Sequence, residues 1–473
     1  VGRDRFDFTT VQNHKQGKSR HIEAKNPVRM EKAARERGSP FVSPTKVCET
    51  KKNHSCVYGK GGVKFKGTDK GGLPKMDQKT LQEITLIDRT GTNSTKWDDL
   101  RASFGEDGLL PVWVADMDFK TPLCVRQALH EAVDQGAFGY YKIPETYHQS
   151  ILTWEETRHD AHWKESWLRT TSGVVTGLFH VLSAITQPGD AVLVQTPVYY
   201  PFYRVIGHTG RRAVYSPLRE ENGVYTPDLE DLEQKITREH VKVFLLCSPH
   251  NPVGRVWTED ELRAMLSICR RHEVQVISDE IHHDILMPGH RHIPAVSLWS
   301  GPNPPITFFS ASKTFNLAGM KNSILAIPQK ETRTKFDAFE RSLGTSSSST
   351  LDYVAVTAAF TSGADWLDGV LAEIFANYQS VKTILSDFPQ VTISPLEGTY
   401  LLWIDLGKVV RRENLHHFVQ SDCGLAPDYG HWFFPEGVRD DTHIRLNLAA
   451  PQSTIKKAAQ QLADGIRKKL SEA

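Results

Sequence analysis

The sequence predicts an α/β protein, with a large domain built on a mostly parallel sheet and a second, smaller α+β domain. Segments typical of strands and helices alternate through the middle of the chain, as in parallel sheets covered by helices. Near the C-terminus this alternation gives way to a long helical pattern, two strand candidates and a terminal helix. At 473 residues, the chain also exceeds the size at which one hydrophobic core usually stops growing.

The large domain contains short apolar runs bounded by turn residues, which predict strands. Residues 241–248 are apolar on both faces, as expected of a strand with helices on both sides. Residues 258–272 begin with a threonine cap and an acidic first turn and end in basic residues, so they predict a helix. The other predicted strands are residues 191–196, 274–280 and 306–311.

The last third of the chain predicts the smaller domain. A helical pattern covers about residues 365–386, residues 399–406 and 442–449 are strand candidates, and a terminal helix runs from about Ser453. We expect four segments: a basic, largely disordered extension (1–75), the N-terminal part of the small domain (76–115), the large domain (116–345) and the C-terminal part of the small domain (346–473).

Charge is distributed unevenly along the chain. Residues 1–75 carry 18 Lys and Arg against 7 Asp and Glu, a net charge of +11, whereas the remaining residues carry 39 against 49, a net charge of −10. We expect the extension to be a non-catalytic, largely disordered segment, either a targeting extension or translated upstream sequence. A basic arm that contacts a nucleic acid or a membrane is the alternative. It has few aromatic residues to interleave with its charges, so we do not expect nucleic-acid binding.

The six cysteines are scattered and form no CxxC pair, so the sequence predicts no zinc site and a reducing compartment. No window approaches eighteen consecutive apolar residues, so we expect no membrane span. A cytoplasmic location follows as the expectation, although the basic extension leaves organelle targeting open.

Three polar residues follow predicted strands, where open α/β sheets place their ligands. Asn251 follows one strand, Asp279 ends the next and Lys313 follows the third, at separations of 28 and 34 residues. Each separation matches about one strand–helix–strand unit, so the side chains are expected to converge. A desolvated lysine amine is a nucleophile for an aldehyde, and a buried aspartate needs a cationic partner. Taken singly, Lys313 also fits a surface lysine in a loop. Asp279 also fits a helix N-cap or a structural ion pair, and Asn251 also fits a turn.

A phosphate site is predicted at residues 172–178, where glycines and a hydroxyl precede a helical pattern. Tyr199, after the strand of residues 191–196, offers an aromatic face to a cofactor ring. These signals are weak alone and gain weight from their order along the chain.

With these motifs the sequence resembles pyridoxal-phosphate enzymes of fold type I, in the cystathionine β-lyase branch related to class I and II aminotransferases. The similarity runs from about Met76 to the C-terminus and implies a seven-stranded sheet. The motifs that carry it are VWVADMDF (112–119), SGVV (172–175), QTPVY (195–199), CSPHNPVGRVWT (247–258), SDEIHHD (278–284), SASKTFNLAG (310–319), EGTYLLW (397–403) and IRLNLA (444–449).

The resemblance implies pyridoxal 5′-phosphate as the cofactor and gives its ring contacts. Lys313 resembles the lysine that forms a Schiff base, and Asp279 resembles the partner of the pyridine nitrogen. Asn251 resembles the donor to the phenolic oxygen, and Tyr199 the stacking aromatic residue. His282 stands where many aminotransferases of this fold carry a tyrosine.

The resemblance also implies how phosphate, substrate and a second subunit are bound. Arg445 resembles the arginine that binds the substrate carboxylate, although a strand arginine paired with an acid is the alternative. Tyr140 resembles the tyrosine that reaches the phosphate from the neighbouring subunit, which implies a homodimer. The phosphate contacts implied within the subunit are Val174, Val175, Ser310, Ser312 and Lys321.

The implied reaction is α,β-elimination from an S-substituted cysteine such as cystathionine, with Lys313 as the general base and pyruvate, ammonia and a thiol as products. An aminotransferase sharing all cofactor contacts is the first alternative, and a regulatory or interaction protein that retains the fold is the second. Residues 344–351 and 428–437 depart from the pattern of the branch, and this leaves the substrate open.

Overall fold

The computed structural model describes residues 87–344, 348–435, 437 and 442–472. The predicted extension of residues 1–75 lies outside the described residues. No helix of the described part is long and apolar enough to cross a membrane.

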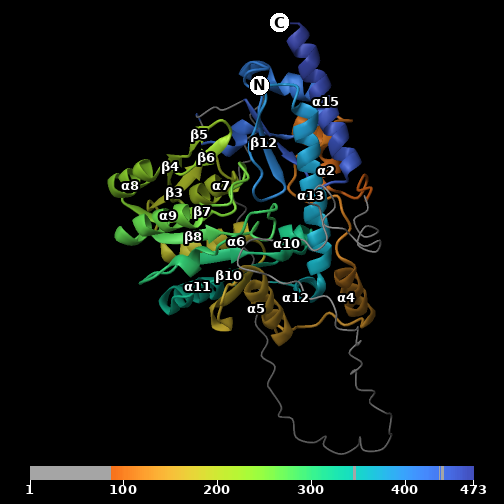
Figure 1. Ribbon diagram of the computed structural model, residues 1–473. Helices are drawn as coiled ribbons and strands as arrows, with labels where there is room; N and C mark the ends of the chain where they lie inside the picture. Colours follow the sequence, from red (N-terminus) through yellow and green to blue (C-terminus); the bar gives the residue numbers. More distant parts are fainter. Residues whose placement is uncertain (1–86, 345–347, 436, 438–441, 473) are drawn as a thin grey trace, which may run out of the picture. The chain divides into compact units, whose positions relative to one another are not determined.

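A seven-stranded sheet forms the centre of the large unit, as the resemblance implied (Figure 1). Six strands are parallel, and β10 alone runs antiparallel to both of its neighbours. The order across the sheet is β2 (Leu168–Thr171), β10 (Ser323–Ala326), β9 (Ile306–Phe309), β8 (Gln275–Asp279), β7 (Val241–Cys247), β3 (Ala191–Thr196) and β4 (Arg212–Pro217). The four strands predicted in this domain are thereby confirmed.

Helices cover both faces of this sheet because alternate residues of its central strands point to opposite sides. Phe244 and Leu246 of β7 pack in a cluster with α8 (Leu229–Arg238) and α9 (Glu259–Arg271). Val243 and Leu245 of the same strand pack on the other side, in a cluster with α6, α7 and α11. The bounds of these helices are α6 (Val174–Ile185), α7 (Pro201–His208) and α11 (Lys330–Leu343).

The predicted helix of residues 258–272 begins where its sequence indicated. The Thr258 hydroxyl accepts a hydrogen bond from the Glu261 N–H, and the Glu261 carboxylate accepts one from the Thr258 N–H at 2.9 Å. This reciprocal cap satisfies two donors that a helix N-terminus otherwise leaves without acceptors.

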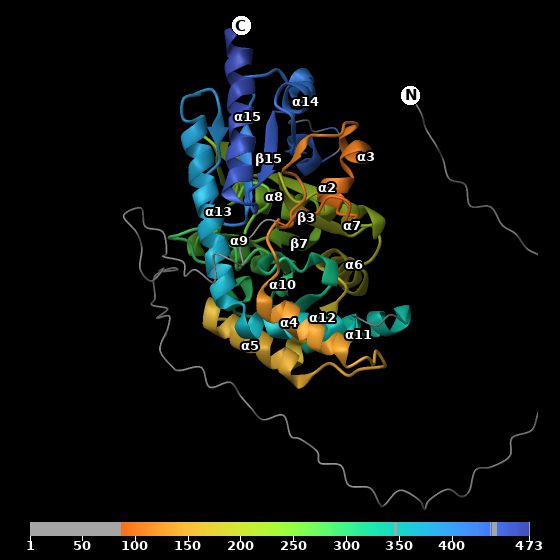
Figure 2. The same cartoon turned by 90° about the vertical axis from the view of Figure 1, so that its right-hand side faces the viewer.

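The smaller unit is built on a four-stranded sheet in the order β11 (Thr392–Ile393), β12 (Leu401–Asp405), β15 (His443–Asn447) and β14 (Asp428–Tyr429). Helices α13 (Ala364–Leu385) and α15 (Gln452–Ser471) lie side by side next to it (Figures 1 and 2). β1 (Leu110–Pro111) pairs with β13 (Leu425–Ala426). The domain boundaries at residues 115/116 and 345/346 stay predictions.

Shorter elements and three further helices complete the described part of the chain. Helix α12 packs against both α4 and α5. The bounds are α2 (Thr95–Asp98), α3 (Leu100–Phe104), α4 (Leu123–Asp134), α5 (Glu145–His159), β5 (Arg219–Glu221), β6 (Val224–Thr226), α10 (Ala311–Thr314), α12 (Thr350–Ser362) and α14 (Leu415–His417), with short 3-10 turns and a π turn between them.

A buried ion-pair network joins α5 to the turn after β8. His159 contacts the Asp284 carboxylate at 2.8 Å, and His283 contacts the Glu155 carboxylate at 2.9 Å. Burial alone lowers the pKa of His283, but the carboxylates of Asp284 and Glu155 outweigh burial and raise it to about 10. Asp284 also accepts a hydrogen bond of 2.7 Å from the hydroxyl of Thr314, so the network fixes α10 to the core.

We predict that Asp284→Asn lowers the free energy of unfolding by about 3–5 kcal/mol, because it removes one charge from a buried, hydrogen-bonded network. Urea denaturation would measure the change. Asp337→Asn is the matched control, since it weakens the half-buried pair of Asp337 with Arg169, whose loss costs about 1 kcal/mol or less. Equal losses in the two variants would contradict this account of the network.

Candidate active site

A cavity of about 350 Å³ lies where the carboxyl ends of β3, β7, β8 and β9 meet. Parallel strands bring their carboxyl ends to the same edge, which is why residues distant in sequence converge there. Ten of the twelve predicted site residues line this cavity: Val174, Val175, Tyr199, Asn251, Asp279, His282, Ser310, Ser312, Lys313 and Lys321. Its volume is in the range of small-molecule sites.

Lys313 projects from α10, the short helix that follows β9. The Ser310 hydroxyl accepts the Ser312 N–H at 3.0 Å and thereby starts this helix. The Lys313 amine donates a hydrogen bond of 2.6 Å to the backbone carbonyl of Ala115. The pKa of Lys313 is lowered to about 8, mainly by burial and also by the neighbouring Arg445 cation, while the carboxylates of Asp116 and Asp279 act in the opposite direction. A substantial neutral fraction near neutral pH suits a nucleophile or a base.

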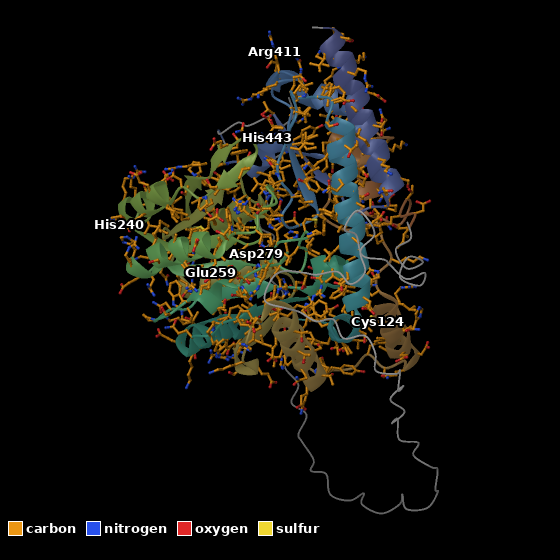
Figure 3. All side chains as sticks on the ribbon, in the orientation of Figure 1. Cys124, His240, Glu259, Asp279, Arg411 and His443 are labelled. Atoms are coloured by element: carbon orange, nitrogen blue, oxygen red, sulfur yellow. The ribbon has the colours of Figure 1, made fainter. Side chains whose placement is uncertain are left out.

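Asp279, labelled in Figure 3, is the last residue of β8 and is buried. Burial raises the pKa of its carboxyl to about 7, although the Ile281 N–H donates a hydrogen bond to it at 3.2 Å. Among the described residues no cationic side chain forms an ion pair with Asp279. A buried carboxylate without such a partner is costly, so this site favours a ligand that brings a cation.

Asn251, His282 and Tyr199 line the cavity around Asp279. The Asn251 side-chain oxygen accepts a hydrogen bond of 2.7 Å from Arg445, so the amide N–H groups of this cavity-lining residue remain as its donors. Burial lowers the pKa of His282 well below its usual value, with Lys313 and Arg445 adding to the shift, so the imidazole is neutral. Burial also raises the pKa of Tyr199, whose hydroxyl therefore stays protonated.

The N-terminus of α6 also lines the cavity. Val174 and Val175 are its first residues, and the first N–H groups of a helix lack acceptors within the helix. Gly173 before them has φ +132°, a conformation that side chains rarely allow. At Gly177 a Cβ atom would lie 2.4 Å from the ring of Phe308, so only glycine lets α6 approach β9 this closely. This end therefore suits a phosphate.

Arg445 does not line the cavity and lies behind Asn251. Its guanidinium is buried and forms an ion pair with Asp428. In the structure Arg445 is therefore a strand arginine paired with an acid, which is one of the two alternatives that the sequence left open for it. Its role toward a substrate carboxylate stays a prediction.

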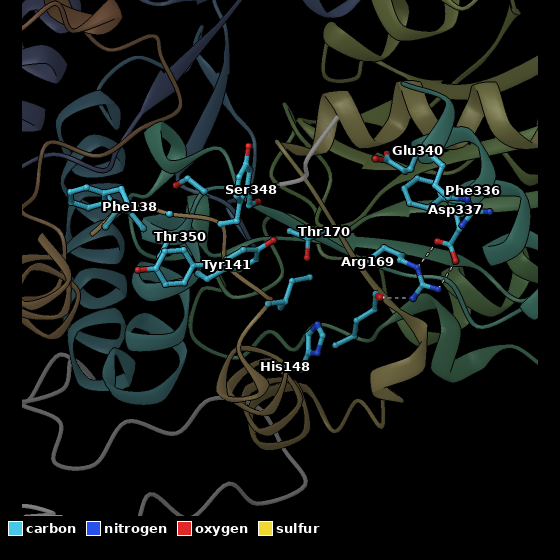
Figure 4. Close-up of a pocket in the computed structure, with 18 residues that line it drawn as sticks. Phe138, Tyr141, His148, Arg169, Thr170, Phe336, Asp337, Glu340, Ser348 and Thr350 are labelled. Atoms are coloured by element: carbon cyan, nitrogen blue, oxygen red, sulfur yellow. Dashed lines mark hydrogen bonds and ion pairs between the residues drawn. The ribbon is translucent and has the colours of Figure 1, made fainter. Parts of the chain in front are cut away.

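Tyr140 also lies outside the cavity and is fully exposed. It lines a larger hollow of about 860 Å³, together with Phe138, Tyr141 and Ser348, and Figure 4 shows this hollow. Part of the serine-rich stretch that departs from the branch therefore lies beside Tyr140. Residues 345–347 of this stretch lie outside the described residues.

Sequence reasoning missed the residues that act through the backbone or from distant elements. The Ala115 carbonyl accepts hydrogen bonds from Lys313 and, at 2.9 Å, from the Tyr400 hydroxyl. A backbone acceptor leaves no signal in a side chain, although Ala115 lies in a motif that carries the resemblance. Further lining residues that were not named as ligands are Ser172, Gly173, Thr176, Cys247, Ile281, Ala318 and Asn322.

These features fit pyridoxal phosphate. Asp279 offers the carboxylate that a protonated pyridine nitrogen needs, Lys313 offers an amine for the aldehyde, and the start of α6 offers N–H groups for the phosphate. Fold and site together define a pyridoxal-phosphate enzyme of fold type I.

The family is shown by comparison with known proteins. The family model described as aminotransferase class I and II matches residues 114–462, and the chain belongs to this family. It is 38% identical to cystathionine beta-lyase PatB of Bacillus subtilis over 320 residues, which are 67% of this chain and 83% of PatB. It is 31% identical to protein MalY of Escherichia coli over 81% of this chain and 98% of MalY.

Solved structures agree with this assignment. The fold matches cystalysin from Treponema denticola, which contains a pyridoxal 5′-phosphate cofactor, with a TM-score of 0.78 and 34% identity. The match covers 82% of this chain and 98% of cystalysin.

We predict that borohydride reduction of the cofactor-loaded protein fixes pyridoxal phosphate to Lys313, because this amine lies in the cavity and is partly neutral at neutral pH. Peptide mass spectrometry would locate the label. Lys313→Ala should lose it, whereas Lys330→Ala, which removes an exposed lysine at the start of α11, should keep it. A label on another lysine in the unaltered protein would contradict the assignment.

Proposed function

We propose that this chain is a pyridoxal-phosphate-dependent carbon–sulfur lyase that acts on S-substituted cysteines such as cystathionine and releases pyruvate, ammonia and a thiol. The proposal rests mainly on the Lys313 amine and the Asp279 carboxyl facing one cavity, with their pKa values brought to about 8 and about 7. Relatives named as cystathionine beta-lyases support the lyase branch over other enzymes of the same fold.

The protein's own residues orient the cofactor and exclude water. When bound, pyridoxal phosphate supplies an electron sink for charge that develops at the substrate Cα. Asp279 would hold a proton at the pyridine nitrogen, and the Asn251 amide would donate to the phenolic oxygen. Tyr199 would stack on the ring, and Val174 and Val175 would donate backbone N–H groups to the phosphate.

Lys313 is the proposed acid and base. Its neutral amine would remove the proton from the substrate Cα, which allows the Cβ–S bond to break. The same amine would then return a proton to the departing sulfur, so the thiol leaves neutral. Arg445 would orient the substrate through its carboxylate. Hydrolysis of the remaining three-carbon fragment gives pyruvate and ammonia.

We predict that the cofactor-loaded protein forms pyruvate from cystathionine with no keto acid added, because elimination needs no amino-group acceptor. Coupled lactate dehydrogenase would measure pyruvate, and a thiol reagent would measure homocysteine in equal amount. Lys313→Ala should lower the rate by at least a hundredfold, since a general base contributes about 10²–10⁴-fold. If amino-group transfer to an added keto acid is found without pyruvate formation, the protein is an aminotransferase.

We also infer that the chain forms a homodimer in which Tyr140 reaches the site of the other copy. Phe138, Tyr141 and Ile143 flank Tyr140 with large exposed hydrophobic side chains, and Phe138 is 62% exposed. Val175 and Phe179 on α6 are also exposed, close to the cavity. A group of exposed apolar side chains indicates a surface that binds a partner. The location that we propose is cytoplasmic, and it is supported by three buried cysteines that form no disulfide in the described part of the chain: Cys247, Cys269 and Cys423.

We predict that the protein sediments as a dimer and that Tyr140→Phe weakens cofactor binding about tenfold while the dimer persists, because one hydrogen bond to a charged phosphate is lost. Sedimentation velocity and fluorescence titration with pyridoxal phosphate would measure the two properties. Tyr141→Phe is the control, since the Tyr141 hydroxyl donates only to the Ala137 carbonyl, at 2.8 Å. A monomer with unchanged cofactor affinity would refute the shared site.

A further inference from the structure

The expected substrate-carboxylate site already contains an internal carboxylate. Asp428 and Arg445 are directly opposed on the paired strands β14 and β15. One terminal nitrogen of the Arg445 guanidinium donates to Asp428, and the other donates to the Asn251 side-chain oxygen at 2.7 Å. The two paired side chains are only 3% and 2% exposed. Asp428 belongs to the segment 428–437 that departs from the pattern of the branch.

This arrangement leaves little of the Arg445 guanidinium open to a second carboxylate. Asp428 and Asn251 each accept from one terminal nitrogen, and the Trp113 carbonyl lies 3.5 Å from the nitrogen that donates to Asp428. The Nε atom has no hydrogen-bond partner in the described part of the chain, but it is buried. The Asp428 charge also cancels the positive charge that would attract an anion. An arriving carboxylate would therefore compete with Asp428 for the one positive charge of Arg445.

We propose that the substrate carboxylate competes with Asp428 for Arg445, and that each carboxylate bound there is accompanied by one proton taken up by Asp428. This inference rests on the proposed function and deepens it. In the exchange the ion pair of Arg445 with Asp428 is replaced by a pair of Arg445 with the substrate, and a solvent proton neutralises Asp428.

The surroundings of Asp428 explain why the proton is needed. The Phe433 ring lies 4.7 Å from the Arg445 guanidinium carbon, and Tyr199 and Tyr200, which precede α7, also face the pair. Both tyrosines stay protonated, since burial raises the pKa of each hydroxyl. A displaced Asp428 carboxylate would thus be a buried anion without a cation, which is costly.

Protonation of Asp428 is accessible even before displacement. Burial raises the pKa of its carboxyl to about 6, although Arg445 acts in the opposite direction. If Arg445 pairs with another anion, the pKa of Asp428 rises further, because the cation that lowered this pKa no longer pairs with it. Lys313 and His282 also lie near Arg445, so any test must separate their protons from that of Asp428.

The test uses propanoate, a carboxylate without an amino group, on the cofactor-loaded protein. Titration calorimetry at pH 8 in buffers of different ionisation enthalpy measures the protons taken up on binding. We expect close to one proton per propanoate, and affinity that rises as the pH falls from 8 to 6. No uptake, or no propanoate binding at either pH, would overturn the proposal, and this arm needs no variant.

Asp428→Asn provides the second arm, because asparagine keeps the shape and can still accept from Arg445. We expect propanoate to bind about a hundredfold more tightly than to the unaltered protein at pH 8, because a pKa of about 6 leaves only about one Asp428 in a hundred protonated at that pH. Asp428→Asn should take up no proton at this position, and the part of the pH dependence between 6 and 8 that Asp428 causes should disappear. Lys313 and His282 are unchanged in this variant, so their protons cannot produce the difference. Asp368→Asn, which alters the distant pair of Asp368 with Arg158, should leave affinity and uptake unchanged.

Kinetics then separates this inference from the proposed function. With cystathionine, Asp428→Asn should lower KM by up to about a hundredfold at pH 8 and leave kcat within twofold. A raised KM would instead make Asp428 a contact of the substrate, and an unchanged KM would leave it without influence on Arg445; both results refute the proposal. If the unaltered protein forms no pyruvate, the proposed function fails, whereas the propanoate experiments still decide the role of Asp428.

Discussion

The arrangement of the site depends on one electrostatic constraint: a carboxyl group and an amine are desolvated together on the edge of a parallel sheet. Burial moves the pKa of Asp279 up to about 7 and that of Lys313 down to about 8. Neither group would adopt these values on the surface, and neither finds an ion-pair partner among the described residues. Burying unpaired ionisable groups opposes folding, and such groups therefore concentrate where a protein binds or transforms a ligand.

The surrounding structure holds these groups in position. β8 is paired on both sides, so the place of Asp279 is fixed by the backbone hydrogen bonds to β7 and β9. The position of Lys313 is fixed through its neighbour Thr314, whose hydroxyl donates to the buried Asp284 carboxylate. Asp284 in turn forms an ion pair with His159 on α5. The helix that would bind phosphate lies close to the sheet because Gly177 leaves room for Phe308. Packing and hydrogen bonding thus offset the cost of the desolvated pair.

Much of this could be predicted from the sequence because it is encoded locally. The apolar run of residues 191–196 is a strand with those bounds, and Asn251, Asp279 and Lys313 converge because strand–helix–strand units repeat at regular lengths. Features encoded by contacts distant in sequence were not predictable. The Ala115 carbonyl that accepts from Lys313 is 198 residues away from it, and a backbone atom has no side-chain signature.

Asp279 and Arg445 differ in whether they already have an internal ion-pair partner, and this difference suits Asp279 to a cofactor that stays bound and Arg445 to a substrate that leaves. Asp279 has no ion-pair partner among the described residues, so a cation that binds there does not have to replace an existing ion pair, although Lys313 acts on Asp279 from the same cavity. Arg445 already has Asp428, so an anion that binds there must replace an existing ion pair and gains only the difference between the two. A cofactor must remain bound through many reactions, whereas a substrate must be released as product. Strong binding at Asp279, which lines the cavity, and weaker net binding at Arg445, which lies behind Asn251, would satisfy these two requirements.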